Sequence, residues 1–111
     1  MGIDMSRGRY SEFDREIKRS AELLSLLSDR NRLGIYAILT YGSSRVSDIY
    51  RCLSLRQNLI SHHLKVLREG GLVKSRRRGR EIYYFLDEDE LDRMKGIFSK
   101  IFRTLELEKF L

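Results

Sequence analysis

The sequence has 111 residues, a formal net charge of +6, 41% hydrophobic residues and a single cysteine. A chain of this length forms one ordinary domain. It contains no apolar run of about 18 residues and no hydrophobic leader, so we predict one cytoplasmic domain over residues 1–111 with no membrane contact. One cysteine excludes an intramolecular disulfide and every zinc site built from cysteine pairs.

The positive charge is concentrated in the middle of the chain. Residues 45–80 contain ten lysines and arginines against two acidic residues, whereas residues 81–111 contain five against eight. A localised basic segment is typical of a nucleic-acid-binding face. A basic membrane-surface patch usually lies on an amphipathic helix, but the densest charge here follows a Gly-Gly pair in a segment without helical periodicity. We therefore favour a nucleic acid as the partner.

Helical periodicity begins after a polar, glycine-bearing segment. We predict a flexible arm at residues 1–10 and an amphipathic helix at residues 11–28, where apolar residues recur at helical spacing. Asp29 offers a cap for a second helix over residues 30–41, with Leu33 among its inward-facing side chains. These two helices precede the most basic part of the chain.

Residues 46–70 are predicted to form two further helices joined by a tight turn. Val46 and Ile49 mark a short first helix, and a second helix with one apolar stripe follows the turn and ends at Gly70. Two short helices joined in this way form a helix-turn-helix, whose second helix is the recognition helix.

A β-hairpin is predicted at residues 72–86. Residues 72–75 and 82–86 read as strands, and the arginine-rich connection between them has Gly79 at its turn. A basic hairpin after a helix-turn-helix is a wing. The predicted fold class is mainly α with a small β-hairpin wing, a winged helix-turn-helix.

The last predicted helix spans residues 88–110, with acidic residues in its first turn where the helix dipole favours them. Its many apolar residues indicate an oligomer interface, because a small domain rarely exposes so apolar a face. We predict dimerisation through the N- and C-terminal helices. The predicted interface residues are Phe13, Ile17, Leu91, Met94, Ile97, Phe98, Ile101, Phe102 and Leu105.

Short motifs in the middle of the chain resemble the ArsR/SmtB family of winged-helix repressors. The similar features are D-x-x-R-L from Asp29, V-x-D-I from Val46, Q-x-x-I-S-H-H-L-K-V-L-R-E-x-G-L-V from Gln57, and R-x-G-R-x-x-Y-Y ending at Tyr84. The resemblance implies a homodimer whose paired recognition helices enter successive major grooves of a double-stranded DNA operator, an imperfect palindrome. It also implies that a ligand or a chemical event releases the DNA.

The sequence departs from the metal-sensing members of that family. Their C-V-C motif falls on Arg45-Val46-Ser47, and no histidine follows His63 to serve a metal site on the last helix. Acidic residues between Asp87 and Asp92 are more often helix-capping charges than a cation site. We predict no metal and no cofactor, and the sequence does not identify the effector.

His62 and His63 are adjacent at the centre of the predicted recognition helix. Neighbouring helical side chains point about 100° apart, so this pair cannot chelate one ion as an i, i+4 pair does. We expect His63 to pack against the domain and His62 to face outward toward DNA.

The predicted DNA-binding residues lie on the recognition helix and the wing. Polar side chains early in a recognition helix reach base edges, whereas basic side chains further along contact phosphates. An arginine-rich wing favours the DNA backbone or the minor groove, and a merely solvated surface is the alternative. The full set is Arg56, Gln57, Asn58, Ser61, His62, Lys65, Arg68, Arg76, Arg77, Arg78 and Arg80.

Cys52 is interpreted as a buried small hydrophobe. The alternative is a redox switch, because Arg51 and Arg56 lie near it in the sequence and nearby cations favour thiol reactivity.

The function predicted from these features is a sequence-specific, homodimeric transcriptional repressor without the usual metal ligands. The alternative is a winged-helix interaction module that binds an acidic protein partner or RNA. An enzyme is not predicted, because the chain offers neither a Ser/His/Asp or Cys/His arrangement nor a glycine-rich phosphate loop.

Overall fold

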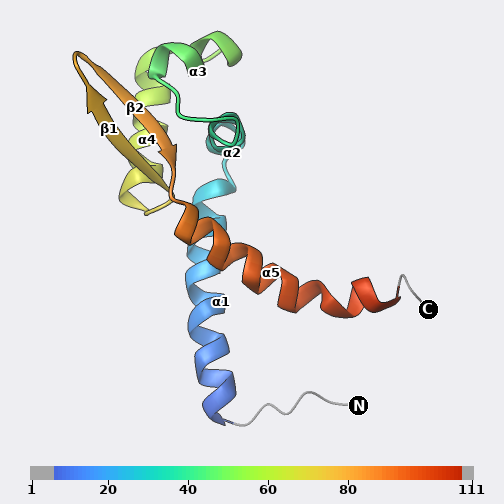
Figure 1. Cartoon of the computed structure of the whole chain (residues 1–111). Coiled ribbons are helices and arrows are strands. Elements are labelled where there is room, and N and C mark those ends of the chain that lie inside the picture. Colours follow the sequence, from blue (N-terminus) through green and yellow to red (C-terminus); the bar gives the residue numbers. More distant parts are fainter. Residues whose placement is uncertain (1–6, 109–111) are drawn as a thin grey trace.

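The computed structural model describes residues 7–108, and the side chains of residues 11–103. Within this range the elements follow in the order α1 (Arg7–Leu27), α2 (Arg30–Leu39), α3 (Val46–Cys52), α4 (Gln57–Glu69), β1 (Val73–Arg78), β2 (Glu81–Leu86) and α5 (Glu88–Glu108). Figure 1 shows α2, α3, α4 and the hairpin gathered at one end, from which α1 and α5 extend. The fold is the predicted mainly helical winged helix-turn-helix.

The first helix is longer than the sequence pattern suggested. α1 begins at Arg7, so residues 7–10 of the predicted arm belong to the helix, while residues 1–6 lie outside the described residues. Two residues after α1 ends, Asp29 caps the start of α2 as predicted. The Asp29 carboxylate accepts hydrogen bonds from the backbone N–H groups of Asn31 and Arg32, at 2.9 and 3.0 Å. These hydrogen bonds, the one from Arg32 first, lower the pKa of Asp29.

The core lies where α2 and α3 pack on the inner stripe of α4. Ile60, Leu64 and Leu67 follow one another at i, i+4 and i+7 on α4, and each is fully buried. Ile35 of α2 and Ile49 of α3 belong to the same cluster and are also fully buried. This burial fixes which side of α4 faces away from the protein.

The predicted inward side of α2 is partly wrong, and Ala37 is exposed as well as Leu33. Leu33 of α2 is 52% exposed, whereas Ile35, Tyr36 and Leu39 are buried. The ten-residue helix α2 carries apolar residues around most of its circumference, so its sequence pattern does not select one inward side. Packing against α1 and α4 makes that selection.

The hairpin projects beyond the helices and is joined to them at its base. Val73 pairs with Leu86 and Arg78 with Glu81. Gly79, the first residue of the turn, has φ = 64°, a conformation that glycine adopts without strain. The strands are therefore longer than predicted, since the arginines of residues 76–78 lie in β1 and not in the connection. The backbone hydrogen bonds between the strands extend to these residues, and their charged side chains stay exposed to water.

An isolated backbone bridge to the segment between α2 and α3 anchors the hairpin. The backbone N–H of Ser44, in the segment between α2 and α3, donates to the carbonyl of Tyr84 at 2.9 Å, and the N–H of Tyr84 donates to the carbonyl of Ser44 at 2.8 Å. These two backbone hydrogen bonds hold the wing against the segment that leads into the helix-turn-helix.

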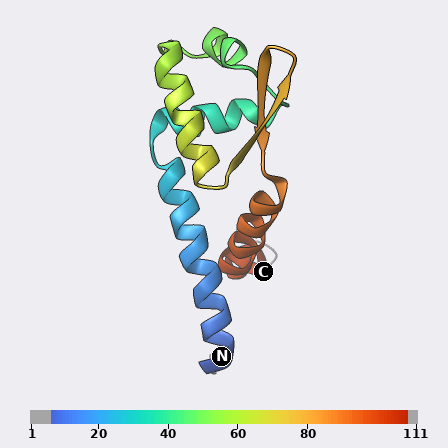
Figure 2. The same cartoon turned by 90° about the vertical axis from the view of Figure 1, so that its left-hand side faces the viewer.

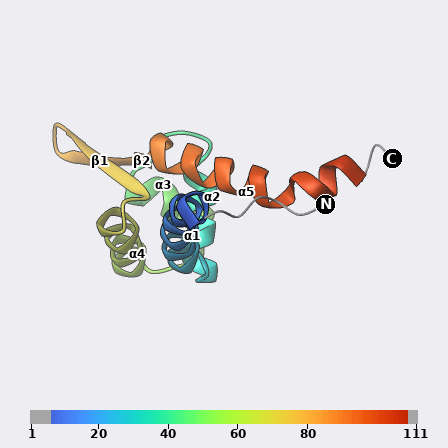
Figure 3. The ribbon, with the colours of Figure 1, turned by 90° about the horizontal axis from the view of Figure 1, so that it is seen from below.

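α1 and α5 extend from the core as two long arms that diverge from each other, as Figure 1 shows. Figure 2 shows both arms on one side of the helix-turn-helix, and in Figure 3 α1 is seen along its axis while α5 runs away from it. Lys100 of α5 pairs with Glu16 of α1 at 3.3 Å, and its ammonium lies 5.9 Å from the centre of the Phe13 ring. Arg19 of α1 pairs with Glu90 of α5 at 3.5 Å. Polar contacts therefore join the two helices where they lie near each other.

The predicted interface residues divide into three groups in the structure. Met94 and Ile97 are each only 4% exposed, so they are already buried within the chain and leave a partner little further surface to cover. Ile101 and Phe102 are 49% and 46% exposed. The half-buried members are Phe13, Ile17, Leu91 and Phe98, and the side chain of Leu105 lies outside the described residues.

The two adjacent histidines are separated by burial, as predicted. His63 is 6% exposed and its Nδ1 has no hydrogen-bond partner, whereas His62 is exposed. Burial lowers the pKa of His63, Arg32 and His62 act in the same direction, and Asp29 opposes them. His63 is a core residue that is buried in its neutral form.

We expect Leu64→Ala to lower the free energy of unfolding by about 2–5 kcal/mol, because it removes fully buried methyl groups and leaves a cavity between three helices. Leu59→Ala on the same helix, where the side chain is 37% exposed, should cost about 1 kcal/mol or less. Urea denaturation followed by circular dichroism measures both losses, and equal losses would contradict the assignment of the inner stripe.

We expect the free energy of unfolding to fall as the pH drops below about 6.5, by at most about 1.4 kcal/mol per pH unit. The reason is that His63 binds a proton more readily in the unfolded chain, where it is in water, than in the folded chain, where it is buried. Above about pH 6.5 the histidine is neutral in both states and contributes no pH dependence. His63→Leu should remove this part of the slope between about pH 7.5 and 5, and the exposed His62→Gln should not. Urea titrations at several pH values check this, and an unchanged slope in His63→Leu would refute it.

Candidate nucleic-acid interface

α4 presents a continuous polar face on the side opposite its buried stripe. From Gln57 to Arg68 the predicted contact residues of the helix fall within an arc of about 140°, given 100° per residue. Amide, hydroxyl and imidazole groups occupy the first half of this face, and cationic groups the second. All the predicted contact residues of this segment are exposed, and so is the acidic Glu69 at the end of the same face: the predicted residues are Arg56, Gln57, Asn58, Ser61, His62, Lys65 and Arg68. The structure thus brings together all the residues predicted on this helix.

The exposed arginines of the wing divide between the two faces of the hairpin. Strand alternation places Arg76 and Arg78 on one face and Arg77 on the other, together with Ser75. The Arg77 face is turned toward α4, because the hydroxyl of Ser75 accepts a hydrogen bond from Arg68 Nη1 at 3.4 Å. Arg77 and the polar face of α4 therefore border the same region of the surface.

The remaining wing residues differ in how they are engaged. Arg80 lies in the turn at the tip and is exposed. The guanidinium of Arg78 lies 5.9 Å from the centre of the Tyr83 ring, a cation–π distance. Lys74, at the base, pairs with Asp87 at 3.7 Å, so the end of the wing nearest the helices already has a counter-charge.

Arg45 ties the wing to the helix-turn-helix. Its Nε and Nη2 donate to the two carboxylate oxygens of Asp48, each at 3.0 Å, and its Nη1 donates to Glu81 Oε2 at 2.8 Å. The same guanidinium lies 5.9 Å from the centre of the Tyr83 ring. We call these four residues the Arg45 bridge. It joins the start of α3 to the first residue of β2, although Arg45 and Glu81 are 36 residues apart.

The Arg45 bridge also closes the first turn of α3. The backbone N–H of Arg45 donates to Asp48 Oδ2 at 2.9 Å, which satisfies a donor at the helix start. Hydrogen bonds from the Arg45 side chain and backbone lower the pKa of Asp48 to about 2. The hydrogen bonds that Arg45 donates to Asp48 and Glu81 raise its own pKa. Both groups therefore stay charged at any physiological pH.

Sequence reasoning missed the role of Arg45. The spacing R-x-x-D was visible and is typical of a local i, i+3 pair. Nothing in the sequence pattern connects Arg45 with Glu81, because their contact depends on the position of the wing relative to α3. An isolated acidic residue within an arginine-rich hairpin was the one available signal.

Cys52 is exposed at the end of α3, so its interpretation as a buried small hydrophobe is wrong. The helix is only seven residues long, and Ile49 supplies its buried side chain. Cys52 instead lines a shallow pocket together with Arg51 and Arg56. The redox switch stays a prediction.

Neither a metal-binding cluster nor a membrane-spanning helix is found in the described part of the chain. No group of three or more His, Cys, Asp or Glu side chains in it is placed to hold one metal ion. None of its helices is long and apolar enough to cross a membrane.

Comparisons with known proteins agree with this geometry. A family model described as a helix-turn-helix domain matches residues 27–76. The chain is 36% identical over 88 residues to the biofilm growth-associated repressor of Agrobacterium fabrum. The aligned region covers 77% of this chain and 75% of the relative. It is 33% identical over 76 residues to the transcriptional repressor SmtB homolog of Synechocystis sp. The aligned region covers 68% of this chain but only 58% of that protein.

A solved structure gives the same result in three dimensions. The transcriptional repressor BigR from Xylella fastidiosa superimposes with a TM-score of 0.65 at 31% identity, over 88% of this chain and 97% of that one. The relatives are transcription regulators and not enzymes, and the matched helix-turn-helix carries the polar face described above. The chain belongs to the ArsR/SmtB family and is a DNA-binding transcriptional regulator.

Proposed function

We propose that this protein is a cytoplasmic homodimeric repressor that recognises an imperfect palindrome in double-stranded DNA. The observation that carries the proposal is the exposed polar face of α4 beside a wing rich in arginine. In this function α4 enters the major groove, where Gln57, Asn58, Ser61 and His62 read base edges. The cationic residues further along α4 and on the wing neutralise phosphates.

The charge distribution supports a polyanionic partner. The exposed wing arginines Arg76, Arg77, Arg78 and Arg80 have few acidic neighbours, and Glu81 is already paired with Arg45. Contact with phosphates relieves the repulsion within such a cluster and releases counterions. An acidic protein or RNA could also do so, but neither explains a polar, base-competent face on the adjacent recognition helix.

The extended shape of the chain supports a homodimer. Its radius of gyration is 17.3 Å, against about 13 Å for a compact domain of this length. The excess comes from α1 and α5, whose exposed apolar side chains include Leu24, Ile101 and Phe102. A second copy that covers these side chains would supply the burial that one chain lacks, and would set two recognition helices about 34 Å apart.

We further propose that the regulator lacks a metal effector at the start of α3. The family's thiolate positions hold Arg45 and Ser47 in this sequence. Arg45 contributes a permanent positive charge that is already bound by Asp48 and Glu81. A cation would have to displace this guanidinium, which carries the same sign of charge.

The test of the function is selection of bound sequences from a random duplex library at near-physiological salt, with the mass of the protein in solution measured alongside. We expect a palindrome to be enriched by a dimer, with half-sites about one helical turn apart. A library that stays random with a folded protein would refute the proposal and favour an acidic protein or RNA partner.

We expect base reading and phosphate contact to be separable by mutation. Gln57→Ala or Ser61→Ala should lower the affinity for the selected operator by about 1–3 kcal/mol and leave the affinity for unrelated duplex nearly unchanged. Arg77→Ala should weaken binding to both duplexes and reduce the salt slope by about one. Fluorescence anisotropy over a range of salt concentrations measures these effects. The reverse pattern would mean that the wing reads the sequence and α4 does not.

We expect Glu81→Gln to weaken operator binding, even though it removes a negative charge from the DNA-binding surface. The reason is that it breaks the ion pair of the Arg45 bridge and lets the wing move relative to α3. Removal of an acidic residue that only repels DNA would instead strengthen binding. Anisotropy measures the affinity, and hydrogen exchange of the β2 amides reports on wing mobility.

Glu69→Gln is the matched control for this prediction. Glu69 is exposed at the end of α4 and pairs with Lys65 at the limit of ion-pair distance, 4.0 Å. Its removal should leave affinity unchanged or raise it. Tighter binding by both variants would show that Glu81 has no positioning role.

A further inference from the structure

Arg19 connects three helices. It lies in α1, where its Nη1 pairs with Glu22 at 3.2 Å. Its Nη2 donates to the carbonyl of Gly70, the residue immediately after α4, at 3.0 Å, and lies 3.5 Å from Glu90 Oε1 of α5. A guanidinium is planar and carries several donors in fixed directions, so it holds these groups in one relative position. Arg19 therefore joins both arms of the chain to the end of the recognition helix.

The chain passes close to α1 at the point where α4 ends. A Cβ atom built on Gly70 would overlap the side chain of Leu26, and one built on Gly71 would lie 2.9 Å from Arg19 Nη2. Gly71 also has φ = 87°, a conformation that glycine adopts without strain. The two glycines thus bring the end of α4 directly against α1 and the Arg19 guanidinium.

The core does not hold this end of α4 by itself. Leu67 is the last fully buried side chain of the helix, and Arg68 and Glu69 after it are exposed. The last carbonyls of a helix have no partner within the helix, and they lie at the negative end of its dipole. Arg19 supplies a donor and a positive charge at this end. The contact therefore fixes the end of α4 relative to α1.

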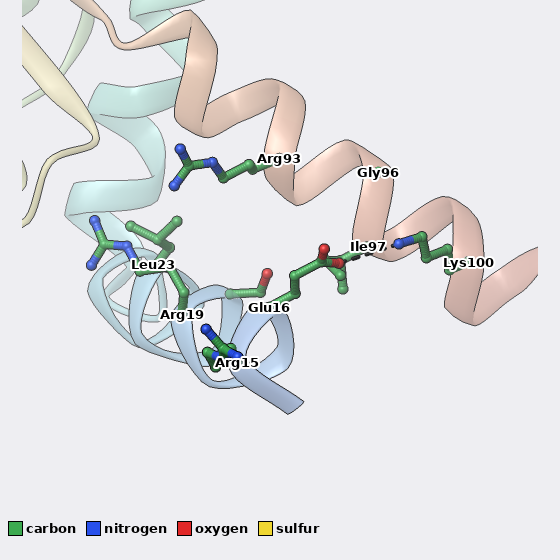
Figure 4. A pocket seen from close by; sticks show the side chains of 9 residues that line it. Arg15, Glu16, Arg19, Leu23, Arg93, Gly96, Ile97 and Lys100 are labelled. Atoms are coloured by element: carbon green, nitrogen blue, oxygen red, sulfur yellow. Dashed lines mark hydrogen bonds and ion pairs between the residues drawn. The ribbon is translucent and has the colours of Figure 1, made fainter. Parts of the chain in front are cut away.

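The second ion pair between the two arms does not reach the recognition helix. Glu16 of α1 pairs with Lys100 of α5 at 3.3 Å, and Figure 4 shows the Arg19 side chain directed away from that pair. Of the polar contacts between α1 and α5 within residues 11–103, only those of Arg19 also include α4. Arg93 shares the Glu90 carboxylate, at 3.7 Å, without a hydrogen bond to α4 in the described structure. Arg19 is thus the link between the arms and α4.

We propose that Arg19 determines which spacing of operator half-sites the protein accepts. It is a positioning residue, which acts through the Gly70 carbonyl and not through contact with a base. This inference rests on the proposed function, because it requires that α1 and α5 join two copies and that each α4 reads one half-site. A two-fold axis applies any change in the angle between α1 and α4 to both copies. A fixed angle therefore suits one spacing, and a loose angle accepts several.

Fluorescence anisotropy with duplexes of altered spacing tests the inference on the full chain. The duplexes are the selected operator, the same operator with one base pair inserted between its half-sites, and a duplex with one half-site only. The insertion moves one half-site by about 3.4 Å and turns it by about 35°, and we expect it to weaken wild-type binding by about tenfold or more. Arg19→Gln should bind the operator about fivefold more weakly and distinguish the two spacings by about threefold or less. Its affinity for the single half-site should equal that of the wild type.

Two further variants separate position from charge. Arg93→Gln is the matched control, since it removes one positive charge beside Glu90 and leaves the contact of Arg19 with Gly70 in place. It should distinguish the spacings as the wild type does. Arg19→Lys keeps the charge, but a single ammonium cannot reproduce the fork of a guanidinium, so it should also lose the discrimination. Full discrimination by Arg19→Lys would show that charge alone matters and would overturn the positioning role.

A measurement without DNA reports on the position of α4 itself. A spin label at Glu69→Cys, in a chain that also carries Cys52→Ser, gives the distance between the two copies of α4 by double electron–electron resonance. We expect a narrow distribution of distances with Arg19 in place and a broader one in Arg19→Gln. Equal widths would overturn the positioning role.

Three other outcomes overturn the inference. The first is unchanged spacing discrimination by a folded Arg19→Gln. The second is an equal loss of affinity for all three duplexes, which would mean a loss of stability or of charge. The third is a loss of dimer mass in light scattering of the Arg19 variants, which would mean that Arg19 holds the two copies together. A failure of the proposed repressor is seen differently, as a wild type that is a monomer or selects no palindrome.

Discussion

Burial of the inner stripe of α4 is the constraint on which the rest of the structure depends. Ile60, Leu64 and Leu67 are fully buried against α2 and α3, and this fixes the rotation of the helix about its axis. When the apolar face of a helix is buried, only its opposite face remains exposed to solvent. In α4 that remaining face carries the amide, hydroxyl, imidazole and cationic groups in one arc. Packing of buried residues therefore positions the polar groups that we propose to contact DNA.

Two arginines position segments that the packing of the core does not hold in place by itself. Arg45 joins the start of α3 to the wing, and Arg19 joins α1 to the chain reversal after α4. The Arg45 contact is a surface ion pair, which adds little to overall stability, and the Arg19 contact is a hydrogen bond to a backbone carbonyl. Their value lies in orientation, because a planar guanidinium with several donors fixes the relative position of groups that are distant in sequence. The wing and the end of the recognition helix are both held in this way.

The sequence by itself determined the class of fold and the polarity of α4. The i, i+4, i+7 stripe that ends at Leu67 identified the buried side, and the 100° step between neighbouring residues separated buried His63 from exposed His62. Asp29 as a helix cap and Gly79 at the hairpin turn followed from local chemistry. Each of these features depends on residues within a few positions of one another, where spacing alone gives the geometry.

Only the tertiary structure decided the features that depend on distant segments. The pair of Arg45 with Glu81, the exposure of Cys52 and the burial of Met94 within its own chain all depend on how α3, the wing and α5 are positioned relative to other elements. The same is true of Leu33, because a helix with apolar residues around most of its circumference acquires an inward side only from its neighbours. Periodicity describes one element at a time, whereas burial and ion pairing are properties of several elements in contact.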